Sequence, residues 1–260
     1  MELRKGSVYL PKARKSGKVK YLCICAYPYD CEIMCIDGIQ RGYRAKKYTF
    51  ACVSSSNVSQ DGKTGLRLMQ KKAAEIGRYN SLYLLKYKLN EIRDPEDENL
   101  VCDYVSIIKE LKPRIIYTYS LFDNDPIRVS VAVKVINALR TMKRSEHPKI
   151  IYGCEVASNL DWIKQEKLVY FNNSKNVRLQ RRLLSVYKSK NYDFNLADST
   201  IGKRLSNGGI FKLDNEFKLS TRAINMTTLL RRKDLPIKRF AMSFVEDLYS
   251  EINDSMDRSL

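Results

Sequence analysis

The chain has little histidine, little tryptophan and a shortage of acidic residues. Its 260 residues include one histidine and one tryptophan, and 29 acidic residues stand against 47 lysines and arginines. One histidine cannot supply the several imidazoles that catalytic zinc sites commonly use. No apolar run of about 18 residues occurs, which argues against a membrane-spanning helix, and the first residues lack the apolar segment of a signal peptide. We therefore expect a cytoplasmic protein.

The excess of basic residues gives a formal net charge of +18. A field of that size attracts polyanions such as nucleic acid, anionic lipid headgroups and phosphate-bearing glycans. The positive charge is clustered in residues 4–20, 41–47 and 175–190, and the last of these segments contains no acidic residue. We weigh polyanion binding against a second interpretation, in which these side chains form a solvated basic surface without a partner.

Cysteines are concentrated near one predicted strand and the helix after it, where Cys23, Cys25, Cys31 and Cys35 fall. Thiols two residues apart on a strand point the same way, and thiols four apart on a helix lie one turn apart. A four-sulfur zinc site is therefore geometrically conceivable. We prefer the interpretation that these thiols are small buried apolar side chains in a reducing compartment.

With 44% hydrophobic residues, the chain can bury one substantial core. We divide it into a basic N-terminal extension, residues 1–19, and a single domain, residues 20–260, that ends in a helical segment. There, Phe240, Phe244, Leu248 and Ile252 recur every four residues, which predicts a helix with an apolar face. We expect this face to pack on the body of the domain, with a partner subunit as the alternative. The oligomeric state is left open.

Apolar runs of strand length alternate with segments of helical periodicity along the chain. Such alternation is typical of an α/β fold with a Rossmann-like, mostly parallel sheet and helices on both faces. Because ligands bind beyond the carboxyl ends of such strands, the loops at 27–30 and 120–128 should face each other across one crevice. The predicted strands cover residues 20–26, 48–54, 81–86, 114–119, 149–154 and 168–171, and the predicted helices cover residues 30–41, 66–76, 100–111 and 129–139.

The segment that closes the first predicted strand, residues 26–30, reads Ala-Tyr-Pro-Tyr-Asp. It resembles the opening motif of the PIG-L/LmbE-like N-acetylglucosamine deacetylases, Ala-His-Pro-Asp-Asp. In that family the His and the second Asp hold zinc, and the first Asp is the general base. The resemblance places Tyr27 at a ligand position and Tyr29 at the base position, and it leaves Asp30 as the matching ligand.

The second loop reads Asp-Pro-Ile-Arg at residues 125–128, where the family has His-Pro-Asp-His. The last His of the family motif is the third zinc ligand, and the first helps to stabilise the tetrahedral intermediate. The resemblance therefore assigns the ligand position to Arg128 and the other position to Asp125. The family's site is thus present as a vestige, made of Tyr27, Tyr29, Asp30, Asp125 and Arg128.

Later segments follow the family's order, so the resemblance extends over most of residues 20–191. Arg67 and Gln70 fit the family's Arg-x-x-Glu helix, and Tyr187-Lys188-Ser189 resembles its Tyr-x-Ser motif. Residues 153–156 resemble its Tyr-Glu-Val-Trp strand. The resemblance implies substrate-binding roles for Arg67, Arg128, Tyr187 and Ser189.

The substitutions in the vestigial site bear on its chemistry. Zinc-dependent amide hydrolysis needs a metal-bound water, a base and positive groups for the oxyanion. A neutral phenol is a poor substitute for an imidazole ligand, and a guanidinium about 4 Å from a dication would repel it by roughly 8 kcal/mol. That repulsion could cancel most of the roughly 10 to 16 kcal/mol that structural zinc binding supplies. We expect no cofactor, and we predict that Arg128 takes the metal's place and pairs with Asp30 and with Asp125. His147, which precedes a proline, is expected at the surface.

Three functions fit these observations. We prefer a metal-free pseudo-deacetylase that binds or scaffolds an anionic or sugar-containing ligand through Arg67, Arg128 and the basic surface. The first alternative is an active zinc-dependent N-deacetylase, whose rebuilt metal site would use Asp30 and Asp125, with Asp123 and with Glu32 or Cys31. The second alternative is a nucleic-acid-binding protein, suggested by basic stretches interleaved with Tyr43, Tyr48 and Tyr187. Binding of this last kind would be non-specific and salt-dependent.

Overall fold

A computed structural model describes residues 3–56, 58, 66–187, 195–209 and 218–260. The described part contains a mixed sheet of eight strands in the order β1-β4-β3-β2-β5-β6-β8-β7. The central strands from β4 to β6 are parallel, whereas β1 runs antiparallel to β4, and β8 runs antiparallel to both β6 and β7. The strands are β1 (Gly6–Tyr9), β2 (Lys18–Cys25), β3 (Tyr48–Ser56), β4 (Ser81–Tyr87), β5 (Ile115–Tyr119), β6 (Ile150–Cys154), β7 (Leu168–Asn172) and β8 (Ser220–Asn225).

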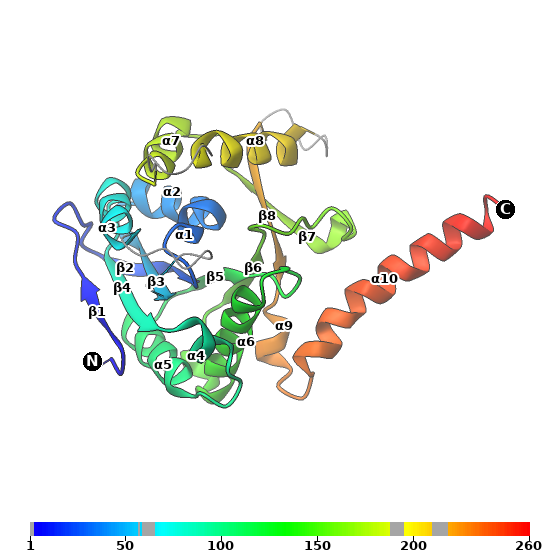
Figure 1. Cartoon of the computed structure of the whole chain (residues 1–260), viewed down its shortest axis with the longest axis horizontal. Helices are drawn as coiled ribbons and strands as arrows, with labels where there is room; N and C mark the ends of the chain where they lie inside the picture. Colours follow the sequence, from blue (N-terminus) through cyan, green and yellow to red (C-terminus); the bar gives the residue numbers. More distant parts are fainter. Residues whose placement is uncertain (1–2, 57, 59–65, 188–194, 210–217) are drawn as a thin grey trace.

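Helices cover both faces of this sheet, so the predicted α/β, Rossmann-like and mostly parallel architecture is confirmed (Figure 1). One face carries α1 (Asp30–Met34), α2 (Ile36–Arg44), α3 (Leu66–Gly77), α7 (Val177–Ser185) and α8 (Leu196–Gly209). The other face carries α4 (Leu89–Arg93), α5 (Asn99–Leu111), α6 (Pro126–Thr141) and α9 (Thr228–Arg231). Two 3-10 turns, η1 (Arg144–Glu146) and η2 (Gln165–Lys167), precede β6 and β7.

The segment expected as an N-terminal extension contributes the edge strand β1, and β2 already begins at Lys18. β1 pairs with β4 in the register Gly6 to Leu85. A Cβ atom on Gly6, whose φ is +147°, would lie 2.7 Å from the Leu84 carbonyl oxygen, so the close approach of the two strands requires glycine. An edge strand of four residues is too short to show an alternating pattern, so the sequence alone does not reveal it.

The helix expected over residues 30–41 is two helices, because the backbone leaves helical geometry at Cys35, where φ is −107° and ψ is 21°. The turn is still hydrogen-bonded, since the Cys35 N–H donates to the Cys31 carbonyl at 2.9 Å and the Ile39 N–H donates to the Cys35 carbonyl at 3.0 Å. Apolar residues continue through this turn at helical spacing, so periodicity alone does not distinguish a bent pair from one straight helix.

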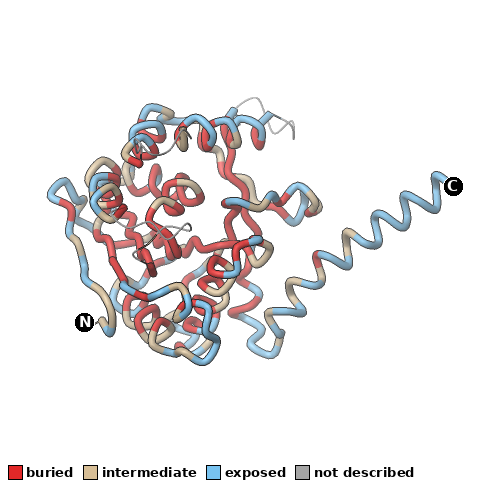
Figure 2. Tube along the Cα trace, in the orientation of Figure 1, coloured by how far each residue is buried: buried red, intermediate tan, exposed pale blue. Residues whose placement is uncertain are grey.

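The C-terminal helix, α10 (Ile237–Asp257), packs its predicted apolar face on the body at Phe240 and Phe244, but not at its far end. Figure 1 shows that it projects away from the sheet, and Figure 2 shows that most of its length is exposed. Phe244 is buried, but Ile252 is 53% exposed. No helix in the described part of the chain is long and apolar enough to cross a membrane.

Candidate functional site

The two loops that the sequence analysis brought together do meet. They leave the carboxyl ends of β2 and β5, which are neighbouring parallel strands with Cys23 opposite Tyr117. The first loop turns into α1 at Asp30, and the second turns into α6 at Pro126. Parallel strands end at the same edge of a sheet, and this is where α/β folds place their ligand sites.

Arg128 and Asp30 form a two-pronged ion pair between these loops. The Arg128 Nε donates to Asp30 Oδ2 at 2.9 Å, and its Nη2 donates to Asp30 Oδ1 at 3.1 Å. The side chains are 3% and 0% exposed, respectively. The predicted pairing of Arg128 with Asp30 is therefore present, and it is the strong bidentate geometry of a guanidinium with a carboxylate.

The second acidic partner of Arg128 is Asp123, whose Oδ1 lies 3.6 Å from Nη1, and this corrects the expectation of Asp125. Asp125 instead caps α6, because its Oδ1 accepts a hydrogen bond from the Ile127 N–H at 2.8 Å. Its other oxygen accepts a hydrogen bond from the Tyr27 hydroxyl at 3.0 Å. Asp125 thus acts as a helix N-cap, for which aspartate is a preferred residue.

Tyr119 completes the cluster and was missed by the sequence analysis. Its hydroxyl donates to Asp30 Oδ2 at 2.6 Å and accepts from the Ala26 N–H at 2.6 Å. The signal for it was available, because Tyr119 is the last residue of a strand that neighbours the Tyr27 loop. A polar side chain at the carboxyl end of a parallel strand points to the site edge.

Electrostatics keep Tyr27 neutral and Arg128 charged. Burial, together with the charge of Asp125 and its hydrogen bond, raises the pKa of Tyr27 well above the usual range, so this phenol stays neutral. Burial alone would lower the pKa of Arg128, but the charge and hydrogen bonds of Asp30 outweigh it and raise that pKa. Arg128 therefore stays a cation, held between the rings of Tyr27 and Tyr119 at 5.4 and 5.9 Å from their centroids.

The residues at this place do not fit a zinc ion. The Asp30 carboxylate has both oxygens on a guanidinium, and the neutral Tyr27 phenol donates to Asp125 rather than offering an anionic ligand. No imidazole is near, because His147 lies after η1 with its Nε2 3.3 Å from the Met142 carbonyl. A buried cation at a ligand position repels a metal dication.

Two residues considered for a rebuilt metal site, Glu32 and Cys31, face a different part of the core. Glu32 is fully buried and accepts from the Tyr79 hydroxyl at 2.8 Å and from the Tyr187 hydroxyl at 2.9 Å. Burial raises the pKa of Glu32 well above its ordinary value. The Cys31 sulfur lies 3.9 Å from the Tyr79 hydroxyl.

The residues expected to bind substrate have separate neighbours. The Tyr187 hydroxyl also lies 2.9 Å from the Pro28 carbonyl, so this side chain ties the end of α7 to the first loop. Arg67 donates to the Leu85 carbonyl, and burial lowers its pKa. Ser189 falls outside the described residues. The pair of Arg128 and Asp30 contacts neither Tyr187 nor Arg67 through these bonds.

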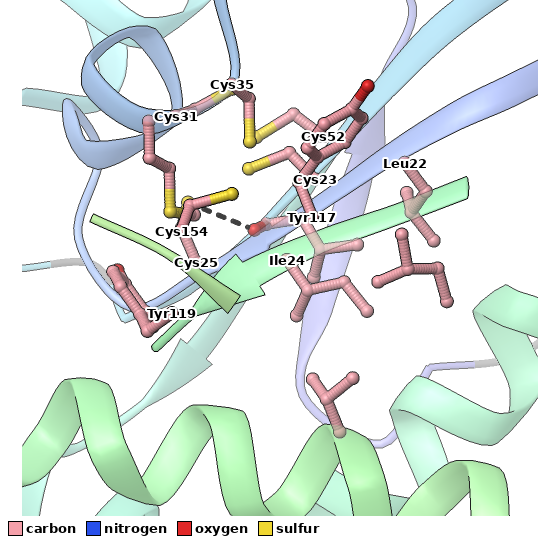
Figure 3. Packing of buried hydrophobic residues seen from close by; sticks show 14 of the residues in the cluster. Leu22, Cys23, Ile24, Cys25, Cys31, Cys35, Cys52, Tyr117, Tyr119 and Cys154 are labelled. Carbon is pink, nitrogen blue, oxygen red and sulfur yellow. Dashed lines mark hydrogen bonds between the residues drawn. The ribbon is translucent and has the colours of Figure 1, made fainter. Parts of the chain in front are cut away.

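A second candidate centre is a group of thiols beneath the first loop (Figure 3). The sulfurs of Cys23, Cys25 and Cys52 lie within 4.8 Å of one another. Cys23 stands opposite Cys52 in the β2–β3 register, and Cys31 reaches the same group from α1. Burial alone would raise the pKa of Cys25, but hydrogen bonds with Cys23 and Cys52 lower it to about 6. Thiolates suit soft ions such as zinc, so these cysteines offer a better donor set than Asp30 does.

The predicted four-sulfur set did not include Cys52, which β3 brings beside Cys23 and Cys25. Cys35 follows α1 and interacts with both Cys23 and Cys154. Sequence spacing could not find Cys52, because the neighbouring strand brings it in from 27 residues away in the chain from Cys25. All of these thiols are also well placed as core side chains, since Cys23, Cys25 and Cys52 are each 0% exposed.

An open surface groove with a volume of about 570 Å³ lies between α3 and α7, and apolar atoms form most of its lining. Arginines of α7 line it together with Ile76 of α3 and Val186 at the end of α7. One of these arginines, Arg181, also pairs with Asp198 at 2.6 Å. The lining residues are Ile76, Arg178, Arg181, Arg182, Ser185 and Val186.

The sequence matches no family model and no curated protein sequence. The fold does match solved structures. The N,N'-diacetylchitobiose deacetylase from Pyrococcus horikoshii has a TM-score of 0.60 and 12% identity, over 82% of this chain and 85% of that one. The conserved protein TT1542 from Thermus thermophilus has a TM-score of 0.60 and 13% identity, over 80% of this chain and 94% of that one.

The protein therefore has the α/β fold found in deacetylases of the PIG-L/LmbE type, as the resemblance of the motifs implied. The same fold also serves GalB, the 4-carboxy-2-hydroxymuconate hydratase from Pseudomonas putida KT2440. GalB matches with a TM-score of 0.57 and 11% identity, over 80% of this chain and 96% of that one. Since deacetylases and a hydratase share it, the fold does not determine the reaction.

Proposed function

We propose that this protein is a metal-free pseudo-deacetylase that acts as a binding or scaffold protein. The observation that carries the proposal is the bidentate pair of Arg128 with Asp30, since it puts a side-chain cation where the deacetylase-like motif would hold zinc. Without the metal there is no Lewis acid, and Tyr29 at the base position cannot deprotonate water near neutral pH.

The ligand that we propose is anionic, and a sugar that carries phosphate or sulfate fits the groove between α3 and α7. The groove combines three arginines with the apolar side chains of Ile76 and Val186. Guanidinium groups recognise phosphate and sulfate through paired hydrogen bonds, and apolar surface accommodates a sugar ring face. Supporting evidence comes from the charge of +18, which raises the local concentration of any anion.

We also propose a reducing, cytoplasmic location, supported by the seven free cysteines. The active deacetylase remains the alternative, and it requires a metal that depends on Asp30. The nucleic-acid-binding alternative has the net charge in its favour, and it predicts an affinity that falls steeply with salt for duplex and single strand alike.

Metal content and activity test the proposal together. Protein purified without chelators would be incubated with excess zinc, desalted and analysed by mass spectrometry for bound metal, then assayed on N-acetylglucosamine derivatives. We expect no deacetylation. We also expect Asp30→Ala to leave the amount of bound zinc unchanged. Zinc that is lost on Cys52→Ala instead belongs to the thiol group; it would contradict the metal-free state but would leave the absence of a catalytic zinc at Asp30 standing. Turnover abolished by Asp30→Ala would refute the pseudoenzyme.

A further inference from the structure

The sheet edge opposite the pair of Arg128 and Asp30 carries a row of exposed cations. The amino ends of the parallel strands meet at this edge, and a basic residue stands at or just before the start of β3, β2, β5 and β6. The sequence supplies these cations from separate segments, so only the fold brings them together. We define the basic rim as six exposed cations at this edge, which are Arg14, Lys18, Lys46, Lys47, Arg114 and Lys149.

Backbone hydrogen bonds between neighbouring strands show that the basic rim is continuous. The Lys18 N–H donates to the Lys47 carbonyl at 3.3 Å, and the Arg114 N–H donates to the Lys20 carbonyl at 3.0 Å. The Lys149 N–H donates in turn to the Arg114 carbonyl at 2.8 Å. Because neighbouring strands lie about 4.8 Å apart, the starts of these four strands form a row about 14 Å long.

The positive charge of the basic rim is not neutralised by ion pairs. Among the described residues, no acidic side chain pairs with any of its six cations. Two acids near this edge have other partners, since Glu75 accepts from the Tyr9 hydroxyl at 2.6 Å and Glu146 lies 3.9 Å from the Lys109 Nζ. A concentration of unpaired cations on one edge attracts a partner with dense negative charge.

An exposed apolar side chain lies at the same edge. Tyr9 stands opposite Leu82, near the start of β4, so the next residue, Leu10, lies beyond the amino end of that strand. Leu10 is 51% exposed, and most of the loop from residue 10 to residue 17 is exposed as well (Figure 2). We propose that the basic rim binds the surface of an anionic lipid membrane, with Leu10 entering the headgroup region. Apolar side chains enter that region while neighbouring cations stay at the phosphates.

The composition of this edge favours a membrane over a nucleic acid. Four of the six cations are lysines, which act as point charges, whereas arginine is the residue that binds single phosphates through two aligned hydrogen bonds. The nearby tyrosine rings already have cations over them, because the Lys20 Nζ lies 4.7 Å from the centroid of Tyr48 and Arg78 lies 5.2 Å from that of Tyr43. Stacking on bases would need free rings. Lipid recognition needs only a cluster of about 4–8 Lys and Arg.

The proposal fixes the orientation of the protein on the membrane. Anionic lipids are concentrated in the cytoplasmic leaflet, which agrees with the cytoplasmic location proposed above. The basic rim and the pair of Arg128 and Asp30 lie at opposite ends of the strands. Binding through the rim would therefore leave the candidate site facing away from the bilayer.

Co-sedimentation with vesicles tests the basic rim. The parent protein should bind vesicles of phosphatidylcholine and phosphatidylserine in equal parts at about 0.15 M salt, and should not bind phosphatidylcholine alone. Each Lys or Arg near an anionic bilayer changes the partition coefficient about fivefold. The triple variant Lys18→Gln, Lys47→Gln and Lys149→Gln should therefore bind about a hundredfold more weakly.

The matched control is Lys72→Gln with Lys86→Gln and Lys238→Gln, which removes the same charge from exposed positions outside the rim. It should bind almost as well as the parent, because charges far from the bilayer are screened. A parent protein that does not bind the anionic vesicles, or equal losses in the two triple variants, would overturn the proposal. Circular dichroism should show the parent's helix content in both variants.

Leu10→Ser separates a membrane from a nucleic acid. It should weaken vesicle binding severalfold and leave the binding of an oligonucleotide unchanged, whereas Leu68→Ser, at a 63% exposed position on α3, should change neither. Vesicle binding that Leu10→Ser does not weaken would contradict the membrane. An oligonucleotide that binds the parent without any vesicle binding, and that the rim variant releases, would assign the rim to nucleic acid instead.

Discussion

At the scale of single residues, the pair of Arg128 and Asp30 decides both function and stability. It joins residues 98 positions apart in the sequence, so it links the loops after β2 and β5. A buried ion pair contributes modestly when it is intact, because desolvation offsets the attraction. Removing one partner is costly, since the other charge is then left buried and unpaired.

Arg128→Ala should therefore lower the free energy of unfolding by about 3–5 kcal/mol. The reason is that Asp30 loses two hydrogen bonds from the guanidinium and keeps only the Tyr119 hydroxyl. Urea denaturation followed by circular dichroism measures the change. The double variant Arg128→Met with Asp30→Asn removes both charges and should recover much of the loss.

A surface pair provides the comparison. Arg181 pairs with Asp198 at 2.6 Å, and both side chains are more than half exposed, at 53% and 58%, so Arg181→Ala should cost less than about 1 kcal/mol. Equal losses at Arg181 and Arg128 would mean that the burial of the Arg128–Asp30 pair does not affect its contribution to stability. That result would contradict its role as the joint between the two loops.

Glu32 should make stability depend on pH. Burial raises its pKa well above the ordinary value, so between the unfolded pKa of about 4.3 and the higher folded pKa the native state holds more protons than the unfolded state. The free energy of unfolding contributed by this group therefore falls as pH rises above about 4.3. Glu32→Gln should be more stable than the parent at pH 8, with the difference shrinking toward pH 4.

Urea titrations of both proteins at several pH values measure this effect. The glutamine can keep both tyrosine contacts, because the Tyr187 hydroxyl can donate to the Pro28 carbonyl and accept from the new amide. Parallel pH profiles for the two proteins would show that the Glu32 carboxyl does not titrate differently on folding.

At the scale of elements, glycines set how closely helices approach the sheet. A Cβ on Gly42 of α2 would lie 2.7 Å from the Phe50 Cβ and 2.9 Å from its backbone nitrogen. Gly42→Ala should therefore destabilise the protein by about 1–3 kcal/mol, although alanine is the better helix former. On α8, Gly202 has nothing within 4 Å of such a Cβ, so Gly202→Ala should stabilise by about 0.5–1 kcal/mol.

Thermal denaturation of the two variants separates packing from helix propensity. Propensity acts in the same direction at both positions, so opposite signs for the two changes isolate the close contact of α2 with β3. A stabilising Gly42→Ala would mean that α2 can move away from Phe50 at little cost.

Much of the fold could be predicted because its central strands are apolar runs that end in polar loops. β2 and β5 were placed within two residues of their observed starts and ends, and the parallel order followed from the alternation with helices. β8 and α8 were not predicted, because Arg222 and Arg204 interrupt their apolar patterns and are buried only through long-range partners. Arg222 pairs with Glu155 at 2.6 Å, and Arg204 donates to the Glu32 carbonyl at 2.7 Å.

The part of the candidate site that lies in the loops after β2 and β5 could be predicted from the sequence. The pairing of Arg128 with Asp30 followed from one charge argument about two adjacent loops. The partner Asp123 required knowledge of rotamers, which spacing along the chain does not contain, whereas the position of Tyr119 at the end of a predicted strand offered a usable signal. The groove between α3 and α7 could not be predicted from the sequence either, since it brings Ile76 beside arginines about 100 residues later in the chain.

At the scale of the whole molecule, the charge of +18 raises the question of whether anion binding is local or general. The double variant Arg178→Ser with Arg182→Ser removes two cations from the groove. We expect it to weaken the binding of a sulfated oligosaccharide by about tenfold or more, because each factor of ten is about 1.4 kcal/mol and two charge-assisted contacts are lost. Fluorescence anisotropy of a labelled oligosaccharide measures the affinity.

The matched control is Arg231→Ser with Arg232→Ser, which removes the same charge from an exposed region outside the groove. It should reduce the affinity only slightly. Equal losses in the two double variants would show that the anion binds through the general field. A labelled oligonucleotide that binds with the same affinity and the same salt dependence would favour the nucleic-acid interpretation instead.

The enclosed thiols also determine how long this molecule survives outside a reducing environment. Six of its cysteines are buried and Cys102 is partly exposed, so an alkylating reagent can reach the six only when the chain opens. The rate at which these thiols are alkylated therefore measures how often the chain opens. Under oxidising conditions the same six thiols can form wrong disulfides in each opened chain before it closes. Lifetime there is then set by the rate of opening rather than by the equilibrium between folded and unfolded chains.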